Sequence, residues 1–514
     1  MSAAFTIVLA AHRPWVRSES GALEEDWFFG ALAGAYLPLV RMLERLHAEG
    51  VRAPVAWALS STLTALLDDD GLRSRAAAAF AEREELCGRE RRSAGTAAAR
   101  TALAFHAERF RKARRAVEGP GRDLAGRLRR LEEDGAVELL AGAGTNALLP
   151  LARPETAAAA HLRLAGREQG RRFGRPAAGV WLPECGYDPA VGVAAAACGF
   201  EYAFVESRAL AVARPRPRCG SYAPVRAPGG LLLLGRDPDA APDAAKLGPY
   251  AHPDFCEPNR DLGLERAGRP CGLTCHRVTG DVPLRDKAPY DPAAAALAAR
   301  ATADAFADAL EARASRLEAE LKTRPVLTAL WEAELFGQEW LEGPLFLERL
   351  LRRLAASGKQ AALRTPEWVV NHAAEAEDVE PETSSWGPGG YFEPWLNDDN
   401  AWMLPHAHGV AERMAELAAR YGPRAEAFPS PLEERALNAC CRLAVLSQSS
   451  DWPCLAGLRS HARWAAGRLA SLVEAFLELR SQLEARRIEP ASLAKGEALV
   501  SGLLPGADFR VFIP

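Results

Sequence analysis

Short apolar runs recur along the chain and constrain its fold more than any other feature of the sequence. They are FTIVLAA (5–11), AVELLAG (136–142), AGVWLPE (178–184), YAFVE (202–206), LLLLGRD (231–237) and PVLTALW (325–331). Helical or loop sequence separates each run from the next. Runs that are buried on both faces and joined by helices are typical of parallel strands in a layered or barrel-shaped sheet. We therefore expect an α/β fold.

Long helices are predicted between and after these runs. Residues 76–135 are mostly Ala, Arg, Glu and Leu with almost no Pro or Gly, and residues 297–322 are similar. Residues 207–275 are rich in Pro, Gly and Arg and weakly periodic, as expected of an insertion or of mobile loops over a barrel mouth. From Pro366 onward the pattern is helical again, over 409–421, 431–447 and 459–486. This last stretch predicts a separate C-terminal helical region.

The composition argues against several kinds of partner. The 514 residues are 48% hydrophobic and 25% charged with a net charge of −4, which is ordinary for a soluble globular protein. No apolar run reaches the roughly 18 residues of a membrane-spanning helix, and the N-terminus lacks the basic region of a signal peptide. A near-neutral charge without basic blocks argues against nucleic acid. We expect a cytoplasmic protein with neither a membrane nor a nucleic-acid partner.

The ten cysteines do not predict a metal site or a disulfide framework. Their spacings, including Cys271 with Cys275 and the adjacent Cys440 and Cys441, match no zinc signature, so we expect scattered reduced thiols. His406 and His408 stand two residues apart in a helical stretch, which points them in different directions. We expect no metal there.

Several apolar runs end on residue types that are used in catalysis. These residues are His12, Thr145 with Asn146, Glu184, Glu206, Asp237 and Glu332. In parallel barrels the active site lies at the C-terminal ends of the strands. One such ending means little, but several that converge predict a site.

Glu184 and Glu332 are the natural catalytic pair in this pattern. VWLPECGYDP (180–189) delivers Trp181 and then Glu184, and PVLTALW leads directly into Glu332. Retaining glycoside chemistry needs two carboxyl groups about 5–5.5 Å apart, one to attack the anomeric carbon and one to protonate the leaving oxygen. The competing interpretation is that each glutamate is solvated or caps a helix, as most glutamates after strands are.

Five ordered motifs give the chain a resemblance to glycoside hydrolase family 57. WLPECGY (181–187) resembles the nucleophile motif of that family, and EAELFGQEWLEGP (332–344) resembles its acid/base motif. The first, second and last motifs of the family have similar counterparts here in AAHRPWVR (10–17), GTNALLP (144–150) and SQSSDWP (447–453). Three further blocks are similar to the 1,4-α-glucan branching enzymes of the family: HRVTGDVPLRDKAPYDP (276–292), SSWGPGGYFEPWLNDDNAW (384–402) and DFRVF (508–512). The resemblance covers the whole chain.

The resemblance implies a (β/α)7 barrel with an inserted small domain and a C-terminal α-helical domain. The expected division is 1–200 and 276–372 for the barrel, 201–275 for the insertion and mobile loop, and 373–514 for the helical domain. The implied activity is cleavage of an α-1,4 link, a covalent intermediate on Glu184, and transfer of the chain to a 6-hydroxyl. The implied partner is an α-1,4-glucan such as amylose, glycogen or starch, and no cofactor or metal is expected.

The acid/base motif departs from the family pattern. Glu332 stands where the family usually has Asp, and Gln338, Glu339 and Trp340 replace His-Trp-Trp. A Glu reaches one methylene further than an Asp, and about 1 Å of misplacement can cost roughly a hundredfold in rate. Glu334 aligns with the family's own Glu and points to the other face if the segment is extended, so we do not expect it to be the acid/base.

The sugar-binding motifs depart as well. Ala10 replaces the first His of the usual His-x-His and leaves His12, and Asn146 stands where the second motif usually has His. The substrate-binding residues implied by the resemblance are His12, Asn146, Trp181, Tyr250, Trp386, Trp395, Trp402, Asp451 and Trp452. Tyr250 belongs to a stretch similar to the mobile loop of branching enzymes. For any single Trp the competing interpretation is a packing role between the helical region and the barrel, and for Asp451 it is an N-cap or a solvated loop.

Two alternatives to a branching enzyme stay open. A glucan-binding pseudoenzyme with little or no turnover would keep the groove and the aromatic blocks, and the altered motif positions favour it. A hydrolase or 4-α-glucanotransferase could use the same scaffold. A barrel deacetylase is disfavoured because those enzymes need a metal-binding His cluster.

Overall fold

The computed structural model describes residues 3–17, 24–119, 122–258, 265–266, 269–270, 273–357, 361–372, 376–422 and 429–513. The chain divides into two compact units, and neither unit is continuous in sequence. The first comprises Met1–Trp57, Leu66–Leu139 and Asp237–Val369. The second comprises Ala58–Ala65, Leu140–Arg236 and Val370–Pro514. The division passes through two strands, β2 (Val55–Leu59) and β3 (Val137–Ala141).

The first unit is organised around β1 (Ala3–Ala11), whose residues are all buried. Its strands run in the order β10 (Val326–Glu332), β1, β2, β3, and β11 (Ala361–Leu363) also pairs with β1. β1 and β10 are parallel, in register from Ala4 opposite Val326 to Ala10 opposite Glu332. A strand covered on both faces shows no polar alternation, which is why FTIVLAA reads as a continuous apolar run.

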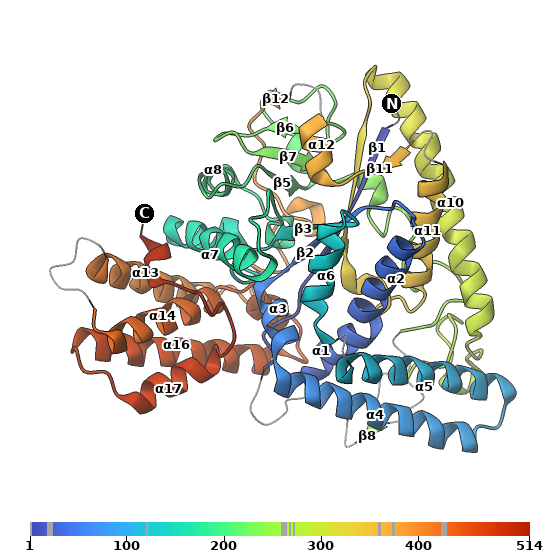
Figure 1. Cartoon of the computed structure of the whole chain (residues 1–514), viewed down its shortest axis with the longest axis horizontal. Coiled ribbons are helices and arrows are strands. Elements are labelled where there is room, and N and C mark those ends of the chain that lie inside the picture. The colour runs from blue at the N-terminus through green and yellow to red at the C-terminus, as the bar shows by residue number, and fades with distance from the viewer. Residues whose placement is uncertain are drawn as a thin grey trace. The chain divides into compact units, whose positions relative to one another are not determined.

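The four long or well-capped helices α4, α5, α6 and α10 of the first unit begin where the sequence supplies an N-cap side chain. Its helices are α1 (Glu25–Ala31), a π-helical turn η1 (Leu32–Tyr36), α2 (Leu37–Ala48), α4 (Asp70–Ser93), α5 (Ala97–Glu118), α6 (Leu124–Glu133), α10 (Pro292–Leu321) and α11 (Gly343–Ser357), while α3 (Ser61–Asp68) and α12 (Pro366–His372) cross between the units. Asp69 and Thr96 accept hydrogen bonds from the first turns of α4 and α5, and these two long helices lie side by side (Figure 1). The helices expected over 76–135 and 297–322 are confirmed.

The sheet of the second unit continues from the last residues of β3. Ala141 pairs in parallel with Val180 of β4 (Gly179–Val180), and β4, β5 (Tyr202–Val205) and β7 (Leu232–Gly235) follow in parallel. β6 (Val225–Arg226) is antiparallel to β7 and pairs with β12 (Glu377–Asp378). Residues 201–275 thus contribute β5, β6 and β7 to this sheet, in addition to loops and the hairpin β8 (Glu265–Arg266)–β9 (Arg269–Pro270).

The C-terminal part of the second unit is helical, as predicted. Beside α7 (Glu155–Phe173), α8 (Pro189–Ala197) and α9 (Ser207–Ala211), this unit has α13 (Met403–Tyr421), α14 (Pro431–Ser447), α15 (Asp451–Gly457), α16 (Ala462–Glu484) and α17 (Pro490–Leu499). Helices α13, α14, α16 and α17 pack together (Figure 1). α14 starts with a capping box in which Ser430 and Glu433 bond each other's backbone N–H groups.

All six predicted apolar runs form strands, and the α/β class is confirmed. The sequence analysis missed β2, whose VAWAL core is as buried as the others. It also overestimated the strand at 178–184, where β4 has two residues and a turn follows. Asp237, two residues after β7, donates its backbone N–H to the Thr328 carbonyl oxygen of β10 at 2.9 Å. None of the described helices is long and apolar enough to span a bilayer.

Candidate active site

Glu184 is carried on a strained turn directly after β4. Residues Pro183–Cys185 form one 3-10 turn, in which Glu184 has φ 60° and Cys185 has φ 51°. Non-glycine residues rarely take this left-handed conformation, which costs on the order of 1–3 kcal/mol per residue and persists when the surroundings enforce it. Pro183 and Cys185 are buried on either side of the half-buried Glu184. Strain of this kind at a strand end is a feature of functional sites.

The Glu184 carboxylate accepts hydrogen bonds from three side chains of the second unit. The Asn146 amide donates to Oε1 at 2.8 Å, and the Ser450 hydroxyl donates to the same oxygen at 3.0 Å. The Trp386 indole N–H donates to Oε2 at 2.9 Å. An ionised carboxylate only accepts hydrogen bonds, so these three donors suit the charged form and fix the plane of the group.

The three donors are themselves held in place. Asn146 Nδ2 also donates to Ser450 Oγ at 3.0 Å, and the Ser450 backbone N–H donates to the Asn146 carbonyl oxygen at 2.8 Å. The Trp386 backbone N–H donates to the Glu184 carbonyl oxygen at 3.0 Å. The Trp386 ring packs against Trp181 with centroids 5.1 Å apart, and Arg236 lies over its face. The carboxylate therefore sits in a pre-organised setting.

Ser450 was not among the residues predicted from the sequence. It belongs to SQSSDWP, the last motif, in which Asp451 and Trp452 are the predicted residues. Asp451 is buried and accepts a hydrogen bond from Ser449 Oγ at 2.7 Å. Trp452 is fully buried and donates to the Leu446 carbonyl oxygen at 2.7 Å. Of this motif, Ser450 is the side chain that contacts Glu184.

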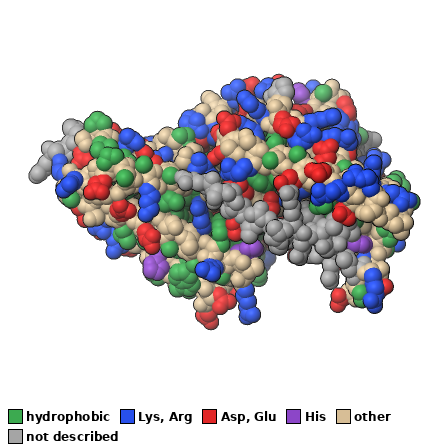
Figure 2. Space-filling model, turned by 90° about the horizontal axis from the view of Figure 1, so that it is seen from below, with side chains coloured by type: hydrophobic (Ala, Val, Ile, Leu, Met, Phe, Trp, Pro, Cys, Tyr) green, Lys and Arg blue, Asp and Glu red, His purple; other side chains and the backbone are tan. Residues whose placement is uncertain are grey.

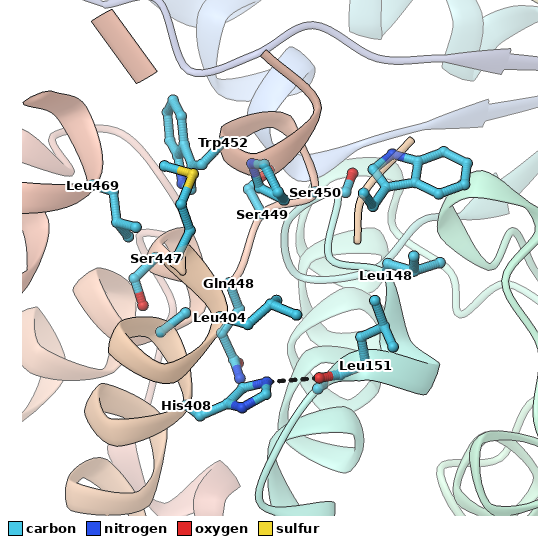
Figure 3. A pocket seen from close by; sticks show the side chains of 15 residues that line it. Leu148, Leu151, Leu404, His408, Ser447, Gln448, Ser449, Ser450, Trp452 and Leu469 are labelled. Atoms are coloured by element: carbon cyan, nitrogen blue, oxygen red, sulfur yellow. Dashed lines mark hydrogen bonds between the residues drawn. The ribbon is translucent and has the colours of Figure 1, made fainter. Parts of the chain in front are cut away.

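A small cavity lies beside the last motif within the second unit (Figure 3). Ser449, Ser450 and Trp452 line it together with apolar side chains such as Leu148 and Leu469. Its volume is about 30 Å³, room for one or two waters and not for a sugar. His408 Nε2 is hydrogen-bonded to the Leu151 carbonyl oxygen at 2.8 Å, the dashed contact in Figure 3. His408 therefore has a structural partner.

The remaining predicted aromatic residues differ in exposure. Trp395 is 5% exposed and lines the same cavity, whereas Trp402 is 49% exposed and donates its indole N–H to the Asp399 carbonyl oxygen at 3.1 Å. Tyr250, in the first unit, is 57% exposed. Flat stacking on a sugar needs an open ring face. By this criterion Trp402 and Tyr250 are available to a ligand and Trp395 is a packing residue.

Two carboxylates near the end of β10 have different surroundings in the first unit. Glu332 is the last residue of the strand, pairs in register with Ala10, and is exposed. Glu334 is buried and accepts hydrogen bonds from the His12 backbone N–H at 3.1 Å and from the Tyr36 hydroxyl. Burial and the Glu334 charge raise the pKa of Tyr36 well above its usual value, so this hydroxyl stays a donor.

A close backbone approach positions the loop after Glu334. Arg13 donates to Gln338, which follows Gly337. A Cβ on Gly34, in the π-helical turn, would lie 2.6 Å from the Gly337 carbonyl oxygen, and Gly337 itself has φ +110°. Both positions therefore require glycine, and π-helical turns are frequent at functional sites. Burial lowers the pKa of Arg13, but Glu334 and other neighbours offset this, so that its pKa is raised overall.

Other polar residues at strand ends have structural partners. Thr145 Oγ1 donates to the Val445 carbonyl oxygen at 2.8 Å, and Glu206 pairs with Arg236 at 3.0 Å. Asp237 is fully buried and pairs with Arg313. Burial raises the pKa of Asp237 to about 6 although Arg313 opposes the effect. Among the described residues, no group of three or more His, Cys, Asp or Glu side chains is placed to hold a metal ion.

Two family models match most of the chain. Residues 6–381 match the model described as glycosyl hydrolase family 57, and residues 406–512 match the model of the 1,4-alpha-glucan branching enzyme C-terminal region. Among curated proteins, a 1,4-alpha-glucan branching enzyme of Thermococcus kodakarensis is 25% identical, over 88% of this chain and 69% of that protein. A probable 1,4-alpha-glucan branching enzyme of Mycobacterium tuberculosis is 29% identical over 98% of this chain and 97% of that protein.

Solved structures match over the full length of the chain. An alpha-amylase from Thermotoga maritima superimposes with a TM-score of 0.89 at 28% identity, over 100% of this chain and 99% of that one. A branching enzyme from Pyrococcus horikoshii superimposes with a TM-score of 0.91 at 24% identity, over 100% and 97%. These likenesses confirm the predicted fold class, a (β/α)7 barrel with a C-terminal α-helical domain.

Proposed function

The chain belongs to glycosyl hydrolase family 57, and on this premise we propose that it is a 1,4-α-glucan branching enzyme. The observation that carries the proposal is the Glu184 carboxylate, held by three donors on a strained turn at a strand end. The choice of chain transfer among the reactions of this family is supported by the match of residues 406–512 to a branching-enzyme model and by the branching enzymes among the relatives.

Glu184 is the nucleophile in the proposed reaction. One carboxylate oxygen attacks the anomeric carbon of an α-1,4-linked glucose, the C1–O bond breaks, and the leaving oxygen takes a proton from the acid/base residue. The resulting ester is then attacked by a 6-hydroxyl of another glucan segment, which gives its proton back to the same residue. The new α-1,6 link forms and Glu184 returns to a carboxylate. Asn146, Ser450 and Trp386 fix the plane of the carboxylate before the attack. Little orientational entropy is therefore lost when the carboxylate oxygen reaches the anomeric carbon.

Glu332 is the proposed acid/base residue. A proton donor must reach the glycosidic oxygen, and Glu332 is exposed at the end of β10, whereas Glu334 is buried against Tyr36 and the His12 backbone. A retaining reaction requires the carboxyl groups of Glu184 and Glu332 to flank one bond at about 5–5.5 Å. The additional methylene of Glu332, relative to the Asp usual in the family, must be accommodated within that separation.

Sugar contacts are assigned to the accessible members of the predicted set. Trp386 is half-buried beside the nucleophile, and Trp402 and Tyr250 have exposed rings that can stack on glucose faces. His12, which is partly exposed, is the polar member of this group. Asn146, Trp181, Trp395, Asp451 and Trp452 are buried, and we do not assign them a sugar contact.

Hydrolysis of α-glucans is the second candidate function. It is favoured by the alpha-amylase from Thermotoga maritima, which is 28% identical over the full chain. The two functions share the covalent step on Glu184 and differ in the acceptor, a sugar hydroxyl or water. They are therefore separable by their products.

The test is incubation of the purified protein with amylose, followed by iodine staining, reducing-end assay and NMR of the anomeric protons. A branching enzyme lowers the iodine colour and produces α-1,6 signals with little increase in reducing ends. An increase in reducing ends without α-1,6 signals identifies a hydrolase. Binding of amylose without either product identifies a pseudoenzyme and contradicts the proposal. Glu184→Gln is isosteric and serves as the inactive control.

A further inference from the structure

A hollow in the surface of the first unit is lined by arginines from three helices. Arg41 and Glu44 come from α2, Arg115 from the last turn of α5, and Arg127 and Arg130 from one face of α6. Ala116 and Gly119 also line the hollow, which has a volume of about 410 Å³. No residue assigned above to catalysis or sugar binding takes part in it.

Positive charge in this hollow is not balanced by the residues around it. Arg127 is buried and makes two hydrogen bonds to the Glu44 carboxylate, at 2.7 and 2.6 Å, so the one acidic group of the lining is already matched. Arg115 and Arg130 are exposed, and neither has an ion-pair partner within the described part of the chain. Arg41 donates to the Lys112 carbonyl oxygen at 2.9 Å, which holds its guanidinium at the hollow without neutralising it.

Neighbouring arginines outside the hollow behave differently. Arg45 of α2 pairs with Glu348, Arg114 of α5 with Glu84 and Glu118, and Arg129 of α6 with Glu133. Mixed charge is also the pattern on the face shown in Figure 2, where basic and acidic side chains are interspersed. Burial and the charge of Arg127 lower the pKa of Arg41, while Glu44 opposes the effect. The charge of Arg127 thus opposes that of Arg41, and an anion bound between the helices would relieve this repulsion.

We propose that this hollow binds a small phosphorylated metabolite, a sugar phosphate or a nucleotide. Guanidinium groups match phosphate oxygens with two parallel hydrogen bonds, and Arg115, Arg130 and Arg41 approach from three helices. The volume exceeds that of a phosphate ion and lies in the range of small-molecule sites, about 300–1,000 Å³. The arginine–carboxylate pairs on the adjoining turns of α5 and α6 disfavour an extended polyanion, which needs continuous positive surface.

Calorimetric titration at a constant ionic strength near that of the cell tests the site. The probes are inorganic phosphate, glucose 6-phosphate and ADP, and heparin reports on polyanion binding. We expect one of the two organic phosphates to bind at least tenfold more tightly than inorganic phosphate. The Arg115→Gln/Arg130→Gln variant should weaken that binding at least tenfold. Arg129→Gln, on the same helix but paired outside the hollow, is the matched control and should bind as the unmodified protein does.

Absence of binding by all three small probes overturns the proposal. Unchanged affinity in the double variant overturns it as well, as does binding of heparin alone. Both arginines are exposed and make no ion pair with the described residues, so the double variant should unfold at the same temperature; if it does not, the single variants Arg115→Gln and Arg130→Gln carry the test. Glu184→Gln should leave phosphate binding unchanged, so this result and the branching assay can fail independently.

Discussion

The side-chain amide of Asn146 donates a hydrogen bond to Oε1 of Glu184 at 2.8 Å, at a position where the family motif usually has histidine. An amide supplies a donor without carrying a charge or titrating in the physiological range. Ser450 and Trp386, which also donate to the Glu184 carboxylate, are neutral as well.

Replacing Asn146 with Asp should impair turnover more than replacing it with Ala. Asp introduces a second carboxylate beside Glu184, and like charges at hydrogen-bond distance raise the pKa of one of the pair. Because the proposed nucleophile must be ionised, the acid limb of the pH–rate profile should shift further to higher pH in Asn146→Asp than in Asn146→Ala, which only removes a hydrogen bond to the charged form. Profiles of kcat/KM on amylose for both variants measure this shift. Coinciding acid limbs would contradict the assigned contact.

Ser450→Ala should lower kcat about 10- to 150-fold with little change in KM. The hydroxyl donates to Glu184, and a hydrogen bond to a charged group contributes roughly 1.5–3 kcal/mol. Ser449→Ala is the matched control, since that hydroxyl bonds Asp451 and not Glu184. If both variants lose the same activity, Ser450 acts through the fold of the last motif and not through the nucleophile.

Glu332 and Glu334 should respond differently to isosteric replacement. Glu332→Gln removes the proposed proton donor and should abolish turnover without altering the melting temperature, because the side chain is exposed. Glu332→Asp should change the rate by less than about tenfold if the backbone tolerates the shorter reach. Glu334→Gln weakens a buried network and should lower the melting temperature. A Glu332→Gln protein with full activity would exclude this residue as the acid/base.

Aromatic substitutions should separate packing from ligand binding. Trp452→Ala and Trp395→Ala truncate buried rings, a loss on the order of 3–5 kcal/mol, and should lower the melting temperature by several degrees. Trp402→Ala removes an exposed ring and should weaken amylose binding at an unchanged melting temperature. Affinity electrophoresis in amylose gels and thermal scans report the two effects. Unaltered amylose binding in Trp402→Ala would remove this residue from the sugar contacts.

Titration of Glu342 should make the first unit less stable as the pH rises from about 4.5 to 7. Glu342 is buried, accepts from the Tyr290 hydroxyl at 2.7 Å, and burial raises its pKa to about 7 despite the hydrogen bonds. The folded state binds this proton more tightly than the unfolded state does. The stabilisation is therefore fully present below the carboxyl pKa of the unfolded chain, and it is lost as the pH rises through the pKa of Glu342 in the folded protein. Glu342→Gln should flatten that part of the melting-temperature curve. If the melting temperature of the variant depends on pH in the same way as that of the unmodified protein, another group causes the dependence.

The strands were predictable from sequence because burial on both faces leaves uninterrupted apolar runs, as in β1 and β10. β2 was missed although VAWAL shows the same signal in a shorter form. The position of Glu184 at a strand end could also be predicted. Its left-handed backbone could not, because local sequence favours that conformation for glycine and asparagine and tertiary packing enforces it here.

The partners of Glu184 were partly accessible to sequence reasoning. Asn146 was expected through the motif it occupies, whereas Ser450 contacts Glu184 across 266 residues of sequence. No periodicity or spacing encodes such a contact. The burial of Trp452 and Trp395 was equally hidden, because a tryptophan in a motif looks the same whether it faces a ligand or the interior.

The place of β10 in the sequence delays the completion of the sheet around β1 on the ribosome. β1 can pair with β2 early, but Phe5 lies in register with Leu327, so about 320 further residues must be synthesised before the other edge of β1 meets β10. At the usual rate of translation, roughly 5–20 residues per second, this takes about 15–65 seconds. During that time one edge of a largely apolar strand lacks its partner. Nascent chains of this protein should therefore be prone to aggregate through that edge until β10 has emerged.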